Sequence, residues 1–140
     1  MESERGPGGM TFQLPARPEF GHELRALLRD WLEDIGARKS DAFEVVLAAM
    51  EAFTNAVEHP HRPTSHLVDV KASLTDGCAT ISIHDYGTWQ GDPTRKEQGG
   101  LGLVIIKTVM DHVHVDADAN GTTVTMKRHL ATPLGFHRLL

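Results

Sequence analysis

The stretch HLVDVKASLTDGCATISIHDY, residues 66–86, decides the fold class. Apolar and polar residues alternate through HLVDVKASL and again through CATISIHDY, the period of two expected of strands that bury one face. Between them, TDG contains the Asp-Gly pair favoured in tight turns between antiparallel strands. The segment is therefore predicted to form a β-hairpin, which makes at least part of the sheet antiparallel.

Two segments before the hairpin have the apolar spacing of helices. Residues 18–36, PEFGHELRALLRDWLEDIG, predict a first amphipathic helix that stops at its final glycine. A second helix is predicted from Ser40 or Asp41, either of which can cap it, up to Pro60. Before both helices, TFQLPA (11–16) alternates and then breaks at a proline, which predicts a short edge strand.

The chain after the hairpin predicts a loop, a helix and two more strands. Residues 87–102 are rich in Gly, Pro and charge, and a loop of about 15 residues is typical of a functional lid or a disordered segment. LGLVIIKTVMDHV (101–113) predicts a mostly buried helix, and VHVDAD, an Asn-Gly turn and TTVTMKRHL predict a second strand pair. The predicted fold class is α+β: a two-layer α/β sandwich with helices on one face of a mixed, mostly antiparallel sheet.

Length and composition predict one globular domain. With 140 residues, 40% of them hydrophobic, the chain can build a single core, and we expect a disordered leader at 1–10, a domain at 11–130 and a tail at 131–140. The net charge of −5 argues against direct nucleic-acid binding. A single cysteine, and the lack of an apolar run long enough for a membrane span or signal peptide, predict a cytoplasmic protein without membrane contact.

The second predicted helix carries polar residues in EAFTNAVEH (51–59). Glu51 and Asn55 are four residues apart and fall together on the side opposite the apolar face. A surface helix shows such a stripe as readily as a ligand site does, so the stripe alone leaves both interpretations open. A zinc site made of His59, His61 and His66 with Glu51 or Glu58 is disfavoured, because the spacing matches no helical histidine pair and prolines interrupt it.

Three glycine-containing patterns follow in chain order. In HDYG, Asp85 can accept a hydrogen bond from an exocyclic amine such as that of adenine, and Gly87 permits close approach to a flat ring. In GGLGL, Gly100 and Gly102 open a helix where backbone N–H groups can reach phosphates. Gly121 begins the last strand after a turn. Each pattern is common when it occurs alone.

Taken together, the order and spacing of these residues resemble the GHKL ATPase superfamily over about residues 41–128. The matching N, G1, G2 and G3 boxes are Glu51-x-x-x-Asn55, Asp85-x-Gly87, Gly100-x-Gly102 and Gly121-Thr122. A short strand ending in LPARPEF, one helix ending in WLEDIG and the N box on the very next helix are similar to the anti-sigma-factor serine kinases. The resemblance implies a Bergerat-type ATP-binding fold, a histidine-kinase-like ATPase domain, over residues 11–130.

The resemblance also implies a role for each matching residue. Asn55 would ligate Mg²⁺ through its side-chain carbonyl, Glu51 would be the general base toward a serine hydroxyl, and Asp85 would bind the adenine amine. The other implied ATP-binding positions are Gly87, Gly100, Leu101, Gly102 and Thr122, with residues 88–99 as the lid over ATP. This loop departs from the family pattern at Trp89, in place of a second glycine, and at Gly99, where a polar or basic residue often stands.

The function implied by the resemblance is regulation of transcription by partner switching. Such a protein sequesters a sigma factor and uses Mg·ATP to phosphorylate a serine on an antagonist of the STAS class, and it is typically a homodimer. Two alternatives stay open from the sequence: a nucleotide-binding regulatory module without kinase activity, and a stand-alone histidine-kinase-like catalytic domain that phosphorylates a separate histidine protein.

Overall fold

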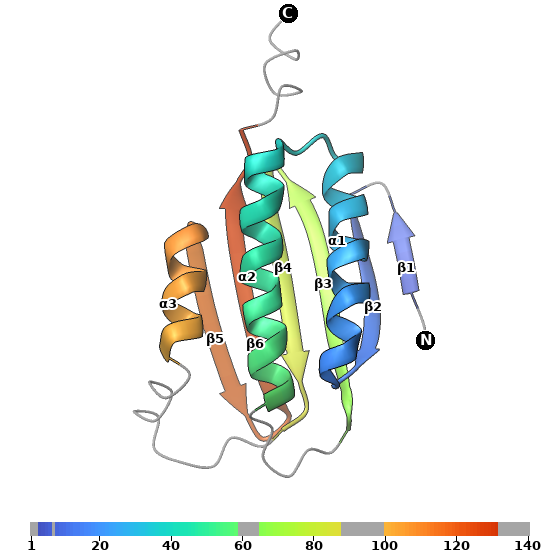
Figure 1. The fold of residues 1–140 in the computed structure, drawn as a ribbon, viewed down its shortest axis with the longest axis vertical. Coiled ribbons are helices and arrows are strands. Elements are labelled where there is room, and N and C mark those ends of the chain that lie inside the picture. The colour runs from blue at the N-terminus through green and yellow to red at the C-terminus, as the bar shows by residue number, and fades with distance from the viewer. Residues whose placement is uncertain (1–2, 7, 59–64, 88–99, 132–140) are drawn as a thin grey trace, which may run out of the picture.

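The hairpin predicted at residues 66–86 forms as β3 (Leu67–Thr75) and β4 (Cys78–Asp85), which pair antiparallel. The turn residues Asp76 and Gly77 have φ values of 52° and 76°, the positive values that a two-residue type I′ turn requires. The computed structural model describes residues 3–6, 8–58, 65–87 and 100–131. The hairpin occupies the middle of the sheet (Figure 1).

Six strands form one sheet in the order β1-β2-β3-β4-β6-β5. The strands outside the hairpin are β1 (Ser3–Gly6), β2 (Gly9–Pro15), β5 (His112–Asp118) and β6 (Gly121–His129). All five pairings that the structure describes are antiparallel, which confirms a mostly antiparallel sheet and leaves no parallel pair among the described strands. β6 follows β5 through a tight turn and pairs with it, and the other edge of β6 pairs with β4. β6 therefore lies between β5 and β4.

The amino-terminal strands differ from the sequence prediction. Residues 1–10 were expected to be a disordered leader, but Ser3–Gly6 form the edge strand β1, and β2 therefore lies inside the sheet edge. An edge strand can be held by backbone hydrogen bonds to one neighbour, so it needs no apolar alternation. The alternation in β2 itself has the predicted effect, because it buries Met10, Phe12 and Leu14.

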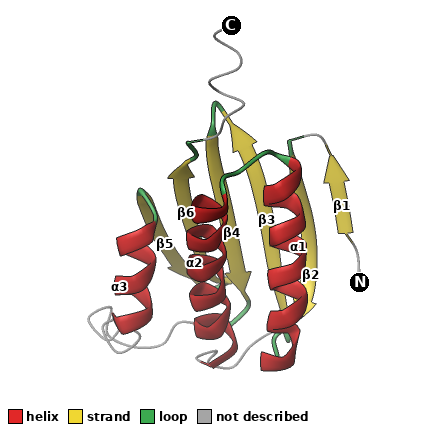
Figure 2. Ribbon diagram, turned by 45° about the horizontal axis from the view of Figure 1, so that its top comes forward, coloured by secondary structure: helices red, strands yellow, loops and turns green. Residues whose placement is uncertain are grey.

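The described helices cover one face of the sheet, and none of them lies on the other face, which we call the open face (Figure 2). They are α1 (Gly21–Asp34), preceded by a 3-10 turn at Pro18–Phe20, α2 (Lys39–Glu58) and α3 (Gly100–Val109). α2 lies between α1 and α3 (Figure 1). Gly36, with φ of 80°, follows the end of α1 as predicted. The predicted two-layer α+β arrangement is thus confirmed.

The layers enclose an apolar core. Its largest fully buried side chains include Phe12, Leu14, Leu24, Leu28, Trp31, Leu32, Phe53, Ile81, Ile83, Ile106 and Met126. The prediction of a mostly buried third helix is wrong, because Ile106 is buried but Val104 is 58% exposed. α3 also ends at Val109, short of the predicted Val113, which instead pairs with β6 as part of β5. No helix in the described ranges combines the length and apolar character needed to cross a membrane.

Asp41 joins three elements at the end of the domain where α2 begins. It was predicted as a helix cap, but its buried carboxylate accepts hydrogen bonds from Arg128 Nε at 3.1 Å, Arg128 Nη2 at 2.9 Å and the backbone N–H of Ala131 at 3.1 Å. Arg128 also donates to the carbonyl oxygen of Val109 and pairs with Glu44. We call these five residues the Asp41 clasp. It ties the start of α2 to the ends of α3 and β6.

Candidate functional site

Glu51 and Asn55 lie one helical turn apart on the side of α2 that faces α3. Gly102, in the first turn of α3, is their neighbour. A Cβ atom placed on Gly102 would lie 3.2 Å from Asn55 Nδ2, 3.4 Å from Asn55 Oδ1 and 3.4 Å from Glu51 Oε2. The structure therefore brings these three predicted site residues together, and the absence of a side chain at Gly102 allows the two helices to approach there.

The polar stripe of α2 is not uniformly exposed to solvent. Thr54 and Glu58 on the same helix are exposed, whereas Glu51 and Asn55 are half-buried beside α3. Partial burial of a carboxylate and an amide costs free energy unless bonded partners compensate for lost water. Glu51 and Asn55 therefore differ from the solvated positions of α2 in that they pack beside α3.

Asp85 ends β4 with its carboxylate held by backbone groups. Oδ1 accepts a hydrogen bond from the N–H of Gly87 at 3.0 Å, and Asp85 is the register partner of Thr122 on β6. Burial raises the pKa of Asp85 above its ordinary 3.8, while the backbone hydrogen bond from Gly87, the charge of His84 and the backbone hydrogen bond from Thr122 oppose that rise. The result is a partly desolvated, oriented acceptor.

Gly121 is packed against the backbone of Asp85. Its φ is 126°, and a Cβ atom at this position would lie 1.9 Å from the Asp85 carbonyl oxygen and 3.0 Å from the Cα of Tyr86. From the sequence alone, the turn prediction requires only a positive φ at Gly121. The close approach was not predictable from the turn, because it depends on how β6 pairs with β4.

The predicted site residues form two groups at one end of the domain. Asp85, Gly87 and Thr122 meet where β4 ends and β6 begins, and the other group lies between the carboxyl-terminal half of α2 and the start of α3. In Figure 1 these ends of β4, β6, α2 and α3 all lie at the bottom of the view. Gly100 and Leu101 begin α3 at this end, so its first backbone N–H groups belong to the same region.

Several sequence predictions fall outside the described residues. They are the lid at 88–99, with Trp89 and Gly99, and the position of His59. Within the described ranges, no group of three or more His, Cys, Asp or Glu side chains is arranged to hold a metal ion. His59 and His61 of the disfavoured zinc site lie outside these ranges.

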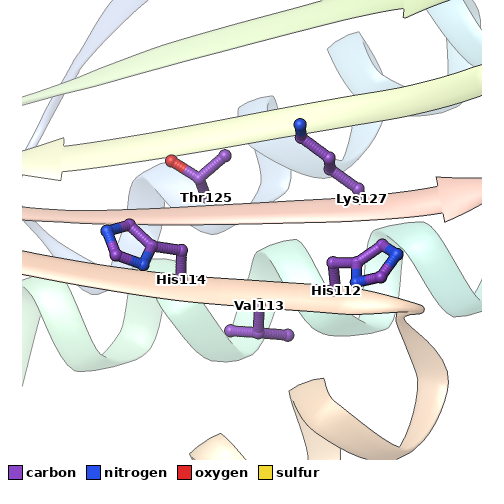
Figure 3. Close-up of a pocket in the computed structure, with 5 residues that line it drawn as sticks. All are labelled: His112, Val113, His114, Thr125 and Lys127. Carbon is purple, nitrogen blue, oxygen red and sulfur yellow. The ribbon is translucent and has the colours of Figure 1, made fainter.

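A cavity of about 360 Å³ lies away from the predicted site. Its lining residues are His112, Val113, His114, Thr125 and Lys127. Figure 3 shows the two histidines on the same side of β5 and Val113 pointing to the other side. The lining comes from β5 and β6 and includes none of the predicted site residues, so this cavity is not the candidate site.

Comparison with known proteins identifies relatives along most of the chain. The model of the histidine kinase-like ATPase domain family matches residues 14–128. The serine-protein kinase RsbW of Bacillus licheniformis is 30% identical and covers 91% of this chain and 89% of that protein. The same-named protein of Listeria innocua is 29% identical and covers 86% of this chain and 87% of its own.

Solved structures show the same fold. A crystal structure of the RsbU and RsbW domains of a Mycobacterium tuberculosis protein matches with a TM-score of 0.74 and 31% identity, covering 89% of this chain and 33% of that longer chain. The histidine kinase domain of a blue-light-activated kinase from Erythrobacter litoralis has a TM-score of 0.58 at 18% identity, covering 84% of this chain and 62% of its own. From the span of the family model and the similarity to serine-protein kinases RsbW, this chain belongs to the histidine kinase-like ATPase domain family.

Proposed function

We propose that the chain is an anti-sigma factor that uses ATP to phosphorylate a serine on an antagonist protein of the STAS class. The observation that carries this proposal is the meeting of Glu51 and Asn55 with Gly102 at the start of α3. A carboxylate and an amide oxygen side by side, next to the first N–H groups of a helix, suit a base and a metal ligand near a terminal phosphate. Similarity to serine-protein kinases RsbW supports serine as the acceptor.

Nucleotide binding in this proposal uses both groups of site residues. The Asp85 carboxylate, oriented by Gly87 and Thr122, accepts a hydrogen bond from the adenine amine. The N–H groups at Gly100 and Leu101 bind phosphate oxygens at the positive end of α3. Gly87 and Gly102 leave space for the ligand.

Magnesium fits the donors that the site offers. Mg²⁺ prefers oxygen ligands and retains phosphate and water oxygens in its shell, and Asn55 Oδ1 is a neutral side-chain oxygen at this position. When bound, the ion would offset negative charge on the β- and γ-phosphates of ATP. Glu51 then takes the proton from the attacking serine hydroxyl, and the first turn of α3 holds the phosphates in place.

Partner switching follows from adding charge to one of two competing proteins. A sigma factor and a STAS antagonist would compete for this chain, and phosphate on the antagonist would weaken its binding through like-charge repulsion and desolvation. The proposal includes a homodimer acting in the cytoplasm, without direct contact with nucleic acid or membrane.

A transfer assay tests the proposal. The purified chain is incubated with γ-labelled ATP, Mg²⁺ and candidate STAS proteins from the same genome, and a STAS protein with its acceptor serine changed to alanine is the control. Acid-stable label on serine supports the proposal. Acid-labile label on histidine would favour the histidine-kinase-like alternative, and ATP binding without transfer to any candidate would favour the regulatory module.

Gly102→Ala tests the helix contact at the site. The added methyl group would crowd the Asn55 amide, with its Cβ 3.2 Å from Nδ2, and shift it by a few tenths of an ångström, so we expect affinity for Mg·ATP to fall about tenfold. The free energy of unfolding should change by less than about 1 kcal/mol, because alanine is the better helix former and offsets the crowding. Calorimetry and urea unfolding measure the two quantities. Val104→Ala, on an exposed position of α3, is the control, and an equal loss of affinity there would contradict the assignment.

Acidification should weaken the preference for adenine. The Asp85 carboxylate is the stronger acceptor for the amine hydrogen bond when it is deprotonated, and burial raises its pKa above 3.8. The preference for adenine should therefore be full above the raised pKa and weaken as the pH falls through it. The measurement is the ratio of affinities for ATP and for purine riboside triphosphate, which lacks the amine, from about pH 8 down through the raised pKa of Asp85. Protonation of the triphosphate affects both nucleotides alike, so its effect cancels in the ratio. A flat ratio in the wild type, matching that of Asp85→Asn, would refute the role of Asp85.

A further inference from the structure

Polar side chains lie on the open face of the sheet, directly behind Asp85. Side chains alternate along a strand, so His84 points away from the helices while Asp85 points toward them. Tyr86 follows His84 onto the open face, where the two rings pack edge to face with centroids 4.6 Å apart. The described helices all cover the opposite face (Figure 2), yet both residues are half-buried.

Side-chain contacts link these two residues to three other strands. His84 Nδ1 on β4 lies 2.7 Å from Thr123 Oγ1 on β6. The Tyr86 hydroxyl donates a hydrogen bond to Asp69 Oδ2 on β3, and Gln13 Nε2 on β2 donates to Asp69 Oδ1 at 2.6 Å. We call Gln13, Asp69, His84, Tyr86 and Thr123 the back-face chain. It crosses the sheet at the level of the candidate nucleotide site.

The back-face chain holds the backbone on both sides of Asp85. The strand β4 ends at Asp85, yet the next residues must keep the Gly87 N–H at 3.0 Å from the Asp85 carboxylate. The hydroxyl of Tyr86 anchors this turn to β3 after the ladder has ended. On the other side, the contact of His84 with Thr123 fixes β6 beside Thr122, whose backbone also bonds to Asp85.

The hydrogen bond from the Tyr86 hydroxyl to Asp69 persists near neutral pH. The hydrogen bond to Asp69, burial and the charge of Asp69 raise the pKa of Tyr86 above its ordinary 10.0. The hydroxyl therefore stays protonated and keeps donating to Asp69.

We propose that Tyr86 is a positioning residue that orients the Asp85 carboxylate toward the amino group of adenine and so sets the preference for adenine nucleotides. This inference rests on the proposed function, in which Asp85 binds adenine. Tyr86 itself lies on the other side of the sheet and does not touch the nucleotide. Its effect passes through the backbone of residues 85–87.

Tyr86→Phe tests the inference by removing the hydroxyl and keeping the ring against His84. The full chain is titrated with ATP and with purine riboside triphosphate, both with Mg²⁺, in a calorimeter. Without the hydrogen bond from Tyr86, the Asp85 carboxylate is less well oriented. The affinity for ATP should therefore fall about fivefold, whereas the affinity for the analogue should change by less than about twofold. Asp69→Asn, which removes the charged acceptor, should shift the ratio in the same direction. Ser73→Ala, elsewhere on the open face of β3, is the control and should leave the ratio unchanged.

The outcomes distinguish failure of this inference from failure of the proposed function on which it rests. If the wild type prefers ATP over the analogue and Tyr86→Phe keeps the same ratio, the inference is wrong and the proposed function stands. Equal weakening for both nucleotides would also overturn it, because a general loss of folded structure affects both alike. If the wild type binds neither nucleotide, the proposed function fails and the inference falls with it.

Discussion

Replacing Glu51 with glutamine is expected to slow phosphoryl transfer to the STAS serine by about 10²–10⁴-fold while leaving affinity for Mg·ATP within about twofold. Glutamine has nearly the same shape as glutamate, so the packing beside Asn55 and Gly102 is preserved. It cannot take a proton from the serine hydroxyl. The rate should therefore lose the contribution of the base, and binding should lose little.

The measurement pairs single-turnover transfer with calorimetry. Glu58→Gln is a matched control, since it neutralises an exposed carboxylate two turns further along the same helix. That variant should transfer phosphate at the wild-type rate. Transfer by Glu51→Gln at the wild-type rate would show that another group is the base. A parallel loss of transfer and ATP affinity would assign Glu51 to binding.

Gly121→Ala is expected to destabilise the protein by about 3 kcal/mol or more and to abolish ATP binding. A φ of 126° is strained for alanine, and its Cβ would lie 1.9 Å from the Asp85 carbonyl oxygen. That oxygen belongs to the backbone and cannot rotate away as a side chain can. Either the β4–β6 pair opens or Asp85 shifts, and both outcomes would damage the proposed adenine-binding part of the site.

Gly77→Ala separates the crowding from the backbone strain. Gly77 also has positive φ, 76°, but a Cβ there would meet nothing within 4 Å. The Gly77→Ala substitution should lower the free energy of unfolding by about 1–2 kcal/mol, the penalty of the backbone conformation alone, and leave ATP binding intact. Urea unfolding of both variants gives the comparison. Equal losses at the two glycines would mean that the contact between Gly121 and Asp85 adds nothing to backbone strain.

Local sequence predicts the helices and the central strands of this fold. It predicts neither the first edge strand nor the contact between Asp41 and Arg128. Alternation in β2, β3 and β4 and the Asp76-Gly77 turn carry their own signal, because burial of one face imposes a period of two. Ser3–Gly6 carry no such signal, since pairing at an edge uses backbone groups that every sequence has. Asp41 has the local chemistry of a cap, but its partner Arg128 lies 87 residues away and was invisible to local reasoning.

The sequence proposes a set of candidate site residues, but it does not predict their geometry. The order of the boxes singled out Glu51, Asn55 and Asp85, but the contact with Gly102 depends on how two helices pack. Tyr86 occupies the variable middle of Asp85-x-Gly87, so the motif gave it no role. The signal that could have found it is strand alternation, which places the neighbours of a site residue together on the opposite face.

The Asp41 clasp and the candidate site occupy opposite ends of α2. At a rise of 1.5 Å per residue, Asp41 and Asn55 are separated by about 20 Å along the helix. The N–H of Ala131 is bonded to Asp41, so the chain leaves β6 at the end remote from the proposed nucleotide site. A fluorophore or surface-immobilisation tag attached to a cysteine introduced at the exposed position of Ala131 would therefore lie at the end of the domain remote from the proposed ATP site.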